Sequence, residues 1–107
     1  MDFDINEVLS DMLKAVKLSV EDSWDETKVV ANQFFERRKE RLELIAELRI
    51  TGKMSQEDFE SRMEDEKLVG EAELHAIAVI SKAMAQKAIN AAIEVLSKAV
   101  KAAIIAI

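Results

Sequence analysis

The residues whose side chains could do chemistry are few, and three of them share one helix face. Glu64, Glu71 and His75 are separated by seven and four residues, which aligns them along a helix. Carboxylates and imidazole are common ligands of divalent metal ions in proteins. A metal-binding helical bundle centred on these three residues is therefore one hypothesis for this chain.

The spacing of this candidate metal site differs from that of known carboxylate bundles. Ferritin-like bundles that bind two metal ions carry Glu-x-x-His pairs, in which the two ligands are three residues apart. Here Glu71 and His75 are four residues apart, and no Glu-x-x-His is present. His75 also lies among Leu74, Ala76 and Ile77, where a single histidine is usually a packed residue. Metal binding thus stays an alternative, and we predict no cofactor.

Other catalytic chemistry lacks its residues. The chain has no cysteine and no tyrosine, and His75 is its only histidine. The serines at positions 19, 23 and 55 stand where helix caps are expected, so they do not suggest a nucleophile. Two isolated glycines cannot form a phosphate-binding loop or a dinucleotide fingerprint. We therefore predict a protein that is not an enzyme.

The composition indicates an all-α protein made of one domain, residues 1–107. The chain contains no proline and only two glycines, whereas a sheet protein of 107 residues would need more turn residues. Apolar periodicity predicts three helices, at about 4–20, 24–50 and 56–106. The expected architecture is a long antiparallel hairpin of the second and third helices, with the first packed on the carboxyl-terminal half of the third.

The connections between these helices differ in clarity. Gly52 suits the left-handed residue after a helix, and Ser55 suits the next N-cap, so residues 51–55 predict a tight turn. Around residues 19–23, Ser23 and Glu26 form a capping-box pattern without Gly or Pro, which fits either a kink or a turn. No stop signal follows Gln56, so the third helix is predicted as a rod of about 75 Å.

Charge is distributed unevenly along the chain. Residues 1–75 hold 20 of the 21 acids and 11 of the 15 bases, while residues 76–107 hold one acid and four lysines. The net charge of −6 argues against a nucleic-acid partner. In the predicted hairpin the Arg-rich stretch of the second helix faces acids of the third, and such a charged layer would fix the helix register. The residues predicted to do so are Arg37, Arg38, Arg41, Glu64, Glu66 and Glu71.

The carboxyl-terminal stretch is the second distinctive feature. Residues 83–107 show two apolar seams, and one neighbouring helix can cover only one of them. Leaving the other in water would forfeit several kcal/mol at about 25 cal/mol per Å². We therefore predict a homo-oligomer, a dimer or larger, although a helix of another protein would cover the same seam. The predicted interface residues are Ile89, Ile93, Leu96, Val100, Ala103 and Ile107.

These patterns predict a non-enzymatic structural or adaptor protein that acts as a homo-oligomer. A second alternative is binding to a membrane surface, because the last helix is cationic and has a narrow stripe of lysines. Charges interrupt it too often for a membrane span. The first residues, MDFDINEV, are acidic and do not resemble a secretory signal, so a cytoplasmic location is expected.

Overall fold

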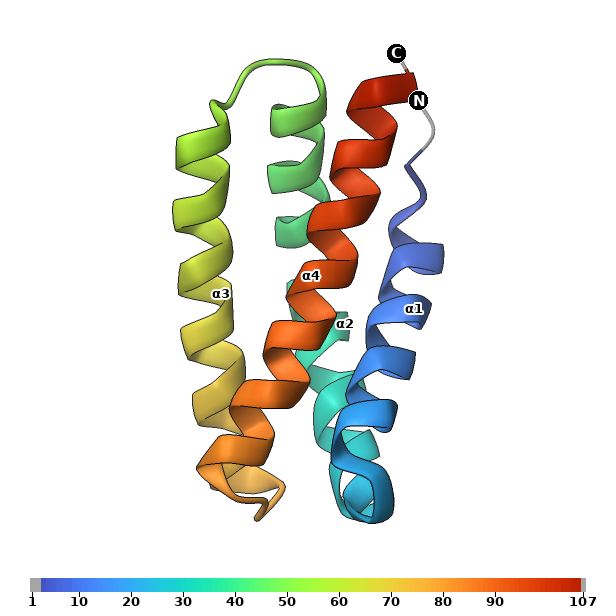
Figure 1. Ribbon diagram of the computed structural model, residues 1–107, viewed down its shortest axis with the longest axis vertical. Coiled ribbons are helices and arrows are strands. Elements are labelled where there is room, and N and C mark those ends of the chain that lie inside the picture. The colour runs from blue at the N-terminus through green and yellow to red at the C-terminus, as the bar shows by residue number, and fades with distance from the viewer. Residues whose placement is uncertain (1–2, 107) are drawn as a thin grey trace.

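The protein, described here by a computed structural model of residues 3–106, is an all-α bundle as predicted (Figure 1). Its α-helices are α1 (Ile5–Val20), α2 (Trp24–Ile50), α3 (Gln56–Ile77) and α4 (Lys82–Ala106). Successive helices run in opposite directions, and α4 packs most extensively against α1. The start of α1 and the end of α4 therefore lie at the same end of a bundle that measures 40 × 23 × 19 Å.

Side-chain hydrogen bonds cap the starts of α1 and α3, and the cap of α3 at Ser55 was predicted. The Asp4 carboxylate accepts a hydrogen bond from the backbone N–H of Asn6 at 2.9 Å, and α1 begins at the next residue. The Ser55 hydroxyl accepts from the N–H of Asp58 at 3.1 Å, which caps α3. Gly52 has a φ of 79°, the left-handed conformation that glycine adopts without a steric penalty. The tight turn at residues 51–55 is thus confirmed.

The joint at residues 19–23 is a reversal of direction and not a kink in one helix. A short 3₁₀ segment, η1 (Glu21–Ser23), connects α1 to α2. The predicted Ser23 capping box is wrong, because the Ser23 side chain makes no capping hydrogen bond. Instead the Thr27 hydroxyl donates to the Ser23 carbonyl at 2.6 Å, and the Ser19 hydroxyl donates to the Ala15 carbonyl at 2.9 Å.

The predicted continuous helix over 56–106 is also wrong, because the chain reverses at residues 78–81. Helix α3 ends at Ile77, and α4 begins at Lys82 after the hydroxyl of Ser81 accepts a hydrogen bond from the Met84 N–H at 3.1 Å. Val79, in between, has a φ of 57°. The reversal folds α4 back onto α1, α2 and α3. The chain therefore forms an up-down-up-down bundle of four helices by itself.

Side chains from all four helices fill the core of this bundle. Helices α2 and α4 contribute eight buried residues each, and in α4 small alanines that allow close approach alternate with larger residues. The buried residues of α4 are Ala85, Ala88, Ile89, Ala92, Ile93, Leu96, Val100 and Ala103. Two seams of α4 are therefore covered within the chain: one by α1, and the other by α2 and α3.

Gly70 marks the closest approach of α3 to α4. A Cβ atom placed on Gly70 would lie 2.9 Å from Cδ1 and 3.2 Å from Cγ1 of Ile89. The absence of a side chain at Gly70 therefore lets Ile89 of α4 pack directly against the backbone of α3.

We expect Gly70→Val to destabilise the fold by about 2 kcal/mol, because its branched side chain overfills this contact. Chemical denaturation would measure the change. The matched variant Gly70→Val with Ile89→Ala restores the space, so it should be more stable than the sum of the two single changes predicts. Additive effects would contradict the contact.

Candidate functional site

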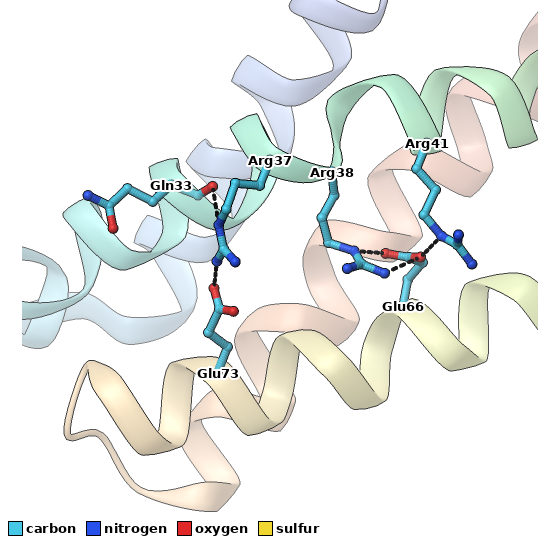
Figure 2. A network of polar contacts seen from close by, with 6 residues as sticks. All are labelled: Gln33, Arg37, Arg38, Arg41, Glu66 and Glu73. Carbon is cyan, nitrogen blue, oxygen red and sulfur yellow. Dashed lines mark hydrogen bonds and ion pairs between the residues drawn. The ribbon is translucent and has the colours of Figure 1, made fainter.

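A cluster of charged side chains joins α2 to α3 near the middle of the bundle (Figure 2). The Glu66 carboxylate is 1% exposed and receives three hydrogen bonds from two arginines. Arg38 donates from Nε at 2.6 Å and from Nη2 at 2.9 Å, and Arg41 donates from Nε at 2.8 Å. Arg37, the residue before Arg38 on α2, forms an ion pair with Glu73. This cluster ties the two helices together at one relative position.

The Arg38 side chain of this cluster packs against an aromatic ring. The Arg38 guanidinium lies over the Phe34 ring, 5.7 Å from its centroid, and Phe34 meets Phe35 edge to face at 5.3 Å. A cation over an aromatic face is attracted by the ring quadrupole. Arg38 therefore joins the acid of α3 to the aromatic core of α2, and no buried polar side-chain atom of residues 3–106 lacks a partner.

The electrostatics of Glu66 suit a structural role. Burial by itself would raise the pKa of the carboxyl group, but the hydrogen bonds from Arg38 and Arg41 and their positive charges outweigh it. The pKa of Glu66 is thus lowered from its ordinary value of 4.5. A carboxylate that is sealed from solvent and held in its charged form is poorly suited to exchange protons with a substrate.

The lowered pKa of Glu66 predicts a loss of stability in acid. Glu66 binds a proton more readily in the unfolded chain than in the native one. Its contribution to the free energy of unfolding is therefore complete above pH 4.5 and disappears as the pH falls through the native pKa. We expect the free energy of unfolding, measured in urea at decreasing pH, to fall more steeply for the wild type than for Glu66→Gln. Parallel curves would contradict the assigned cause.

Four of the six predicted register charges belong to this cluster: Arg37, Arg38, Arg41 and Glu66. Glu64 instead pairs with Lys67 on its own helix, at 3.7 Å. Glu71 forms none of the ion pairs found in residues 3–106, and Glu73 takes the place predicted for it. Sequence reasoning could have found Glu73, since it lies seven residues, about two turns, beyond the glutamate paired with Arg38.

The tail residues predicted as an oligomer interface lie inside the bundle. Ile89, Ile93, Leu96, Val100 and Ala103 are each 0–3% exposed, whereas Ile107 lies outside the described residues. This is a correction, since the prediction assumed that only α1 could cover α4. The reversal at residues 78–81 brings α2 and α3 against the other seam, so these five residues are not on the surface of the folded chain.

The predicted metal ligands do not form a site. Among residues 3–106, no group of three or more histidine and acidic side chains is arranged to hold a metal ion. Glu64 is engaged with Lys67, and the Nδ1–H of His75 donates to the Ile80 carbonyl at 2.8 Å. His75 therefore stabilises the turn between α3 and α4, and the structure does not bring Glu64, Glu71 and His75 together as a three-ligand site.

The structure also bears on the membrane alternative. The apolar face of α4 is buried in the bundle, so the surface that an interfacial helix would insert into lipid is already covered. Within residues 3–106, no helix has the length and apolar composition needed to cross a membrane.

A groove of about 480 Å³ lies between α4 and the ends of α2 and α3 that flank the 51–55 turn. Its apolar floor includes Phe59, Val100 and Ile104. At its rim Arg49 donates to Gln56 at 2.9 Å, and Lys98 pairs with Glu94 at 2.9 Å. Four of the six polar residues that line the groove are thus paired with one another, and Ser97 and Lys101 are the other two.

The exposed side of α3 and the turn after it carry a patch that sequence reasoning missed. Of the eight large apolar residues exposed within residues 3–106, four fall between positions 68 and 79. With Ala72 between them, we call these residues the α3 strip: Leu68, Val69, Ala72, Ile77 and Val79. Their exposed fractions reach 58% for Leu68, 62% for Ile77 and 86% for Val79.

The α3 strip is where the surface departs most from that of an ordinary solvated helix. Single exposed apolar residues are common, but grouped ones mark interaction sites. A signal was available in the sequence, because apolar residues at 68 and 69 widen the apolar arc of α3 beyond one seam.

Comparison with family models, with curated proteins and with solved structures gives no match to this chain.

Proposed function

We propose that this chain is a non-enzymatic adaptor that binds a basic amphipathic helix of another protein on the α3 strip. The observation that carries the proposal is the group of exposed apolar residues on one acidic helix. A partner helix laid against them would bury apolar surface on both sides, which is the main driving force of such contacts.

The charge of α3 determines the chemistry of this partner. Helix α3 contains eight acidic residues and two basic ones; Glu66 and Glu73 are paired with arginines of α2, and the other six acids leave the helix with a net charge of −4. Glu64 and Asp65 are exposed next to Leu68, at the start of the strip. Complementary charge speeds the encounter of two surfaces and disfavours partners of like charge. Lysines or arginines beside the apolar face of the partner would meet these acids.

The length of the strip sets the size of the partner. Leu68 and Ile77 are nine residues apart, which is about 14 Å along the axis of α3 and about half a turn around it, and Val69 and Ala72 lie between them on the surface. A partner helix of about three turns spans this distance. A contact of that size falls among small, reversible interfaces, so we expect micromolar affinity.

A designed peptide that carries the proposed apolar and basic pattern would test this proposal directly. The probe is a helix with leucines at i, i+3, i+4 and i+7 and lysines elsewhere, and its control is a scrambled peptide of the same composition. In an NMR titration, we expect saturable shifts of amides in residues 64–77 with the amphipathic peptide only. Leu68→Ser with Ile77→Ser should weaken binding at least tenfold.

A matched surface variant and the remaining outcomes complete this test. Leu18→Ser removes a residue that is 77% exposed on α1, and it should leave binding unchanged. Equal binding of both peptides, or shifts spread over all four helices, would overturn the proposal. A change in oligomeric state on Leu68→Ser would identify the strip as a contact between copies of this chain, and it would also overturn the proposal.

A further inference from the structure

The turn between α3 and α4 holds a residue in an unfavourable conformation. Val79 has a φ of 57°, a region that β-branched residues rarely enter because the side chain crowds the backbone. The Val79 side chain is 86% exposed, so little packing within the bundle holds it there. A conformation of this kind persists only when the surrounding structure imposes it.

Little in the sequence favours a turn at this place. Residues 78–81 are Ala-Val-Ile-Ser, without the Gly, Pro, Asn or Asp that commonly form turns. Two side-chain hydrogen bonds hold the reversal: His75 to the Ile80 carbonyl, and the Met84 N–H to the Ser81 hydroxyl. A continuous helix would replace both with backbone hydrogen bonds and return Val79 to an ordinary helical φ.

Opening this turn would remove α4 from its own bundle. Ile89, Leu96 and the other buried residues of α4 would then be exposed to water, which is strongly unfavourable for one chain alone. A second open copy offers a matching space between its own α1, α2 and α3. Every contact of α4 can be remade there, because the two copies have the same sequence.

We infer that two copies of this chain exchange α4, each with one continuous helix from Gln56 to Ala106. The contacts of α4 are the same in both forms, so the balance between them depends on the strained turn and on the protein concentration. In the exchanged dimer, Ile89, Ile93, Leu96, Val100 and Ala103 contact the partner copy. The inference is independent of the partner proposed for the α3 strip.

The joint between α1 and α2 is the competing place for an exchange, since Glu21 also has a positive φ, of 49°. Two of its three residues, Asp22 and Ser23, favour breaks in helices, whereas only Ser81 does so among residues 78–81. Hydrogen bonds of Ser19 and Thr27 to backbone carbonyls reinforce the last turn of α1 and the first turn of α2. Exchange at the α3–α4 turn is therefore favoured.

The contact between Gly70 and Ile89 distinguishes the two places of exchange. It joins α3 to α4, so it lies within one chain in the monomer and in an α1-exchanged dimer. It lies between chains only if α4 is exchanged. We would refold the full chain at about 10 µM and at about 1 mM, and measure its mass by light scattering after size exclusion.

In dimers refolded from a mixture of ¹³C-labelled and unlabelled chains, we expect isotope-filtered NOEs from the Ile89 methyl groups to the Gly70 α-protons of the other chain. Val79→Gly relieves the strain in the closed form and weakens the helix of the open form. Val79→Gly should lower the dimer association constant about a hundredfold, because each dimer contains two copies of the turn and both effects occur in each copy. Ser81→Ala, which removes a bond of the closed turn only, should raise it.

The control is Ala102→Gly, which weakens an exposed part of α4 equally in both forms and should leave the association constant unchanged. The inference would be overturned if the wild type and Ser81→Ala both stayed monomeric at about 1 mM. A dimer whose NOEs between Gly70 and Ile89 stay within one chain, or a dimer that Val79→Gly strengthens, would also overturn it. Loss of peptide binding to the α3 strip would not affect it.

Discussion

Glu66→Gln is expected to destabilise the protein by about 3 kcal/mol, because it removes the negative charge to which Arg38 donates two hydrogen bonds. Glutamine has nearly the same volume as glutamate, so the loss reports charge and hydrogen bonding and not a cavity. Its amide NH₂ would also face a guanidinium that can only donate. Urea denaturation at neutral pH would measure the difference.

Glu73→Gln is the matched control for this change. Its partner Arg37 is 61% exposed, and ion pairs that water reaches contribute little, here less than about 1 kcal/mol. A double change, Glu66→Gln with Arg38→Met, should recover part of the loss, because it removes the unpaired cation. Equal effects of Glu66→Gln and Glu73→Gln would show that burial does not set the strength of this cluster.

Leu96→Ala is expected to destabilise the monomer by about 3 kcal/mol, because Leu96 is fully buried and its removal leaves a cavity in the bundle. The loss should be the same at every protein concentration at which the chain is monomeric. Thermal and chemical denaturation at two such concentrations would measure it.

Ile105→Ala provides the comparison on the same helix. Ile105 is 75% exposed, so its truncation should change stability by less than about 0.5 kcal/mol. If Leu96 instead lay at a surface contact between copies, Leu96→Ala would give a monomer of undiminished stability. That outcome would favour the interface first predicted for this helix over the intrachain core.

Local signals predicted the parts of the fold that depend on few residues. Asp4, Gly52 and Ser55 each act through their own conformation or one hydrogen bond, so the start of α1 and the turn at 51–55 could be foreseen. The contact of Arg41 with Glu66 also followed from the register of the hairpin that this turn creates. Short-range geometry therefore fixed the pairing of α2 and α3.

The reversal at residues 78–81 could not be predicted in this way. Its residues favour a helix, and the turn forms because packing of α4 on the other three helices outweighs their local preference. Only Ser81 signals a helix start. Missing this reversal led to the other errors: α4 was expected to need a second chain, and the exposure of Ile77 and Val79 was not foreseen.

The start of α1 and the end of α4 lie at the same end of the bundle, so the same core could form with the helices connected in a different order (Figure 1). A short linker between these ends, with new termini opened in the exposed turn at 51–55, would yield a circular permutant with the same core. In that permutant α4 is connected to α3 by the turn at residues 78–81 and to α1 by the new linker.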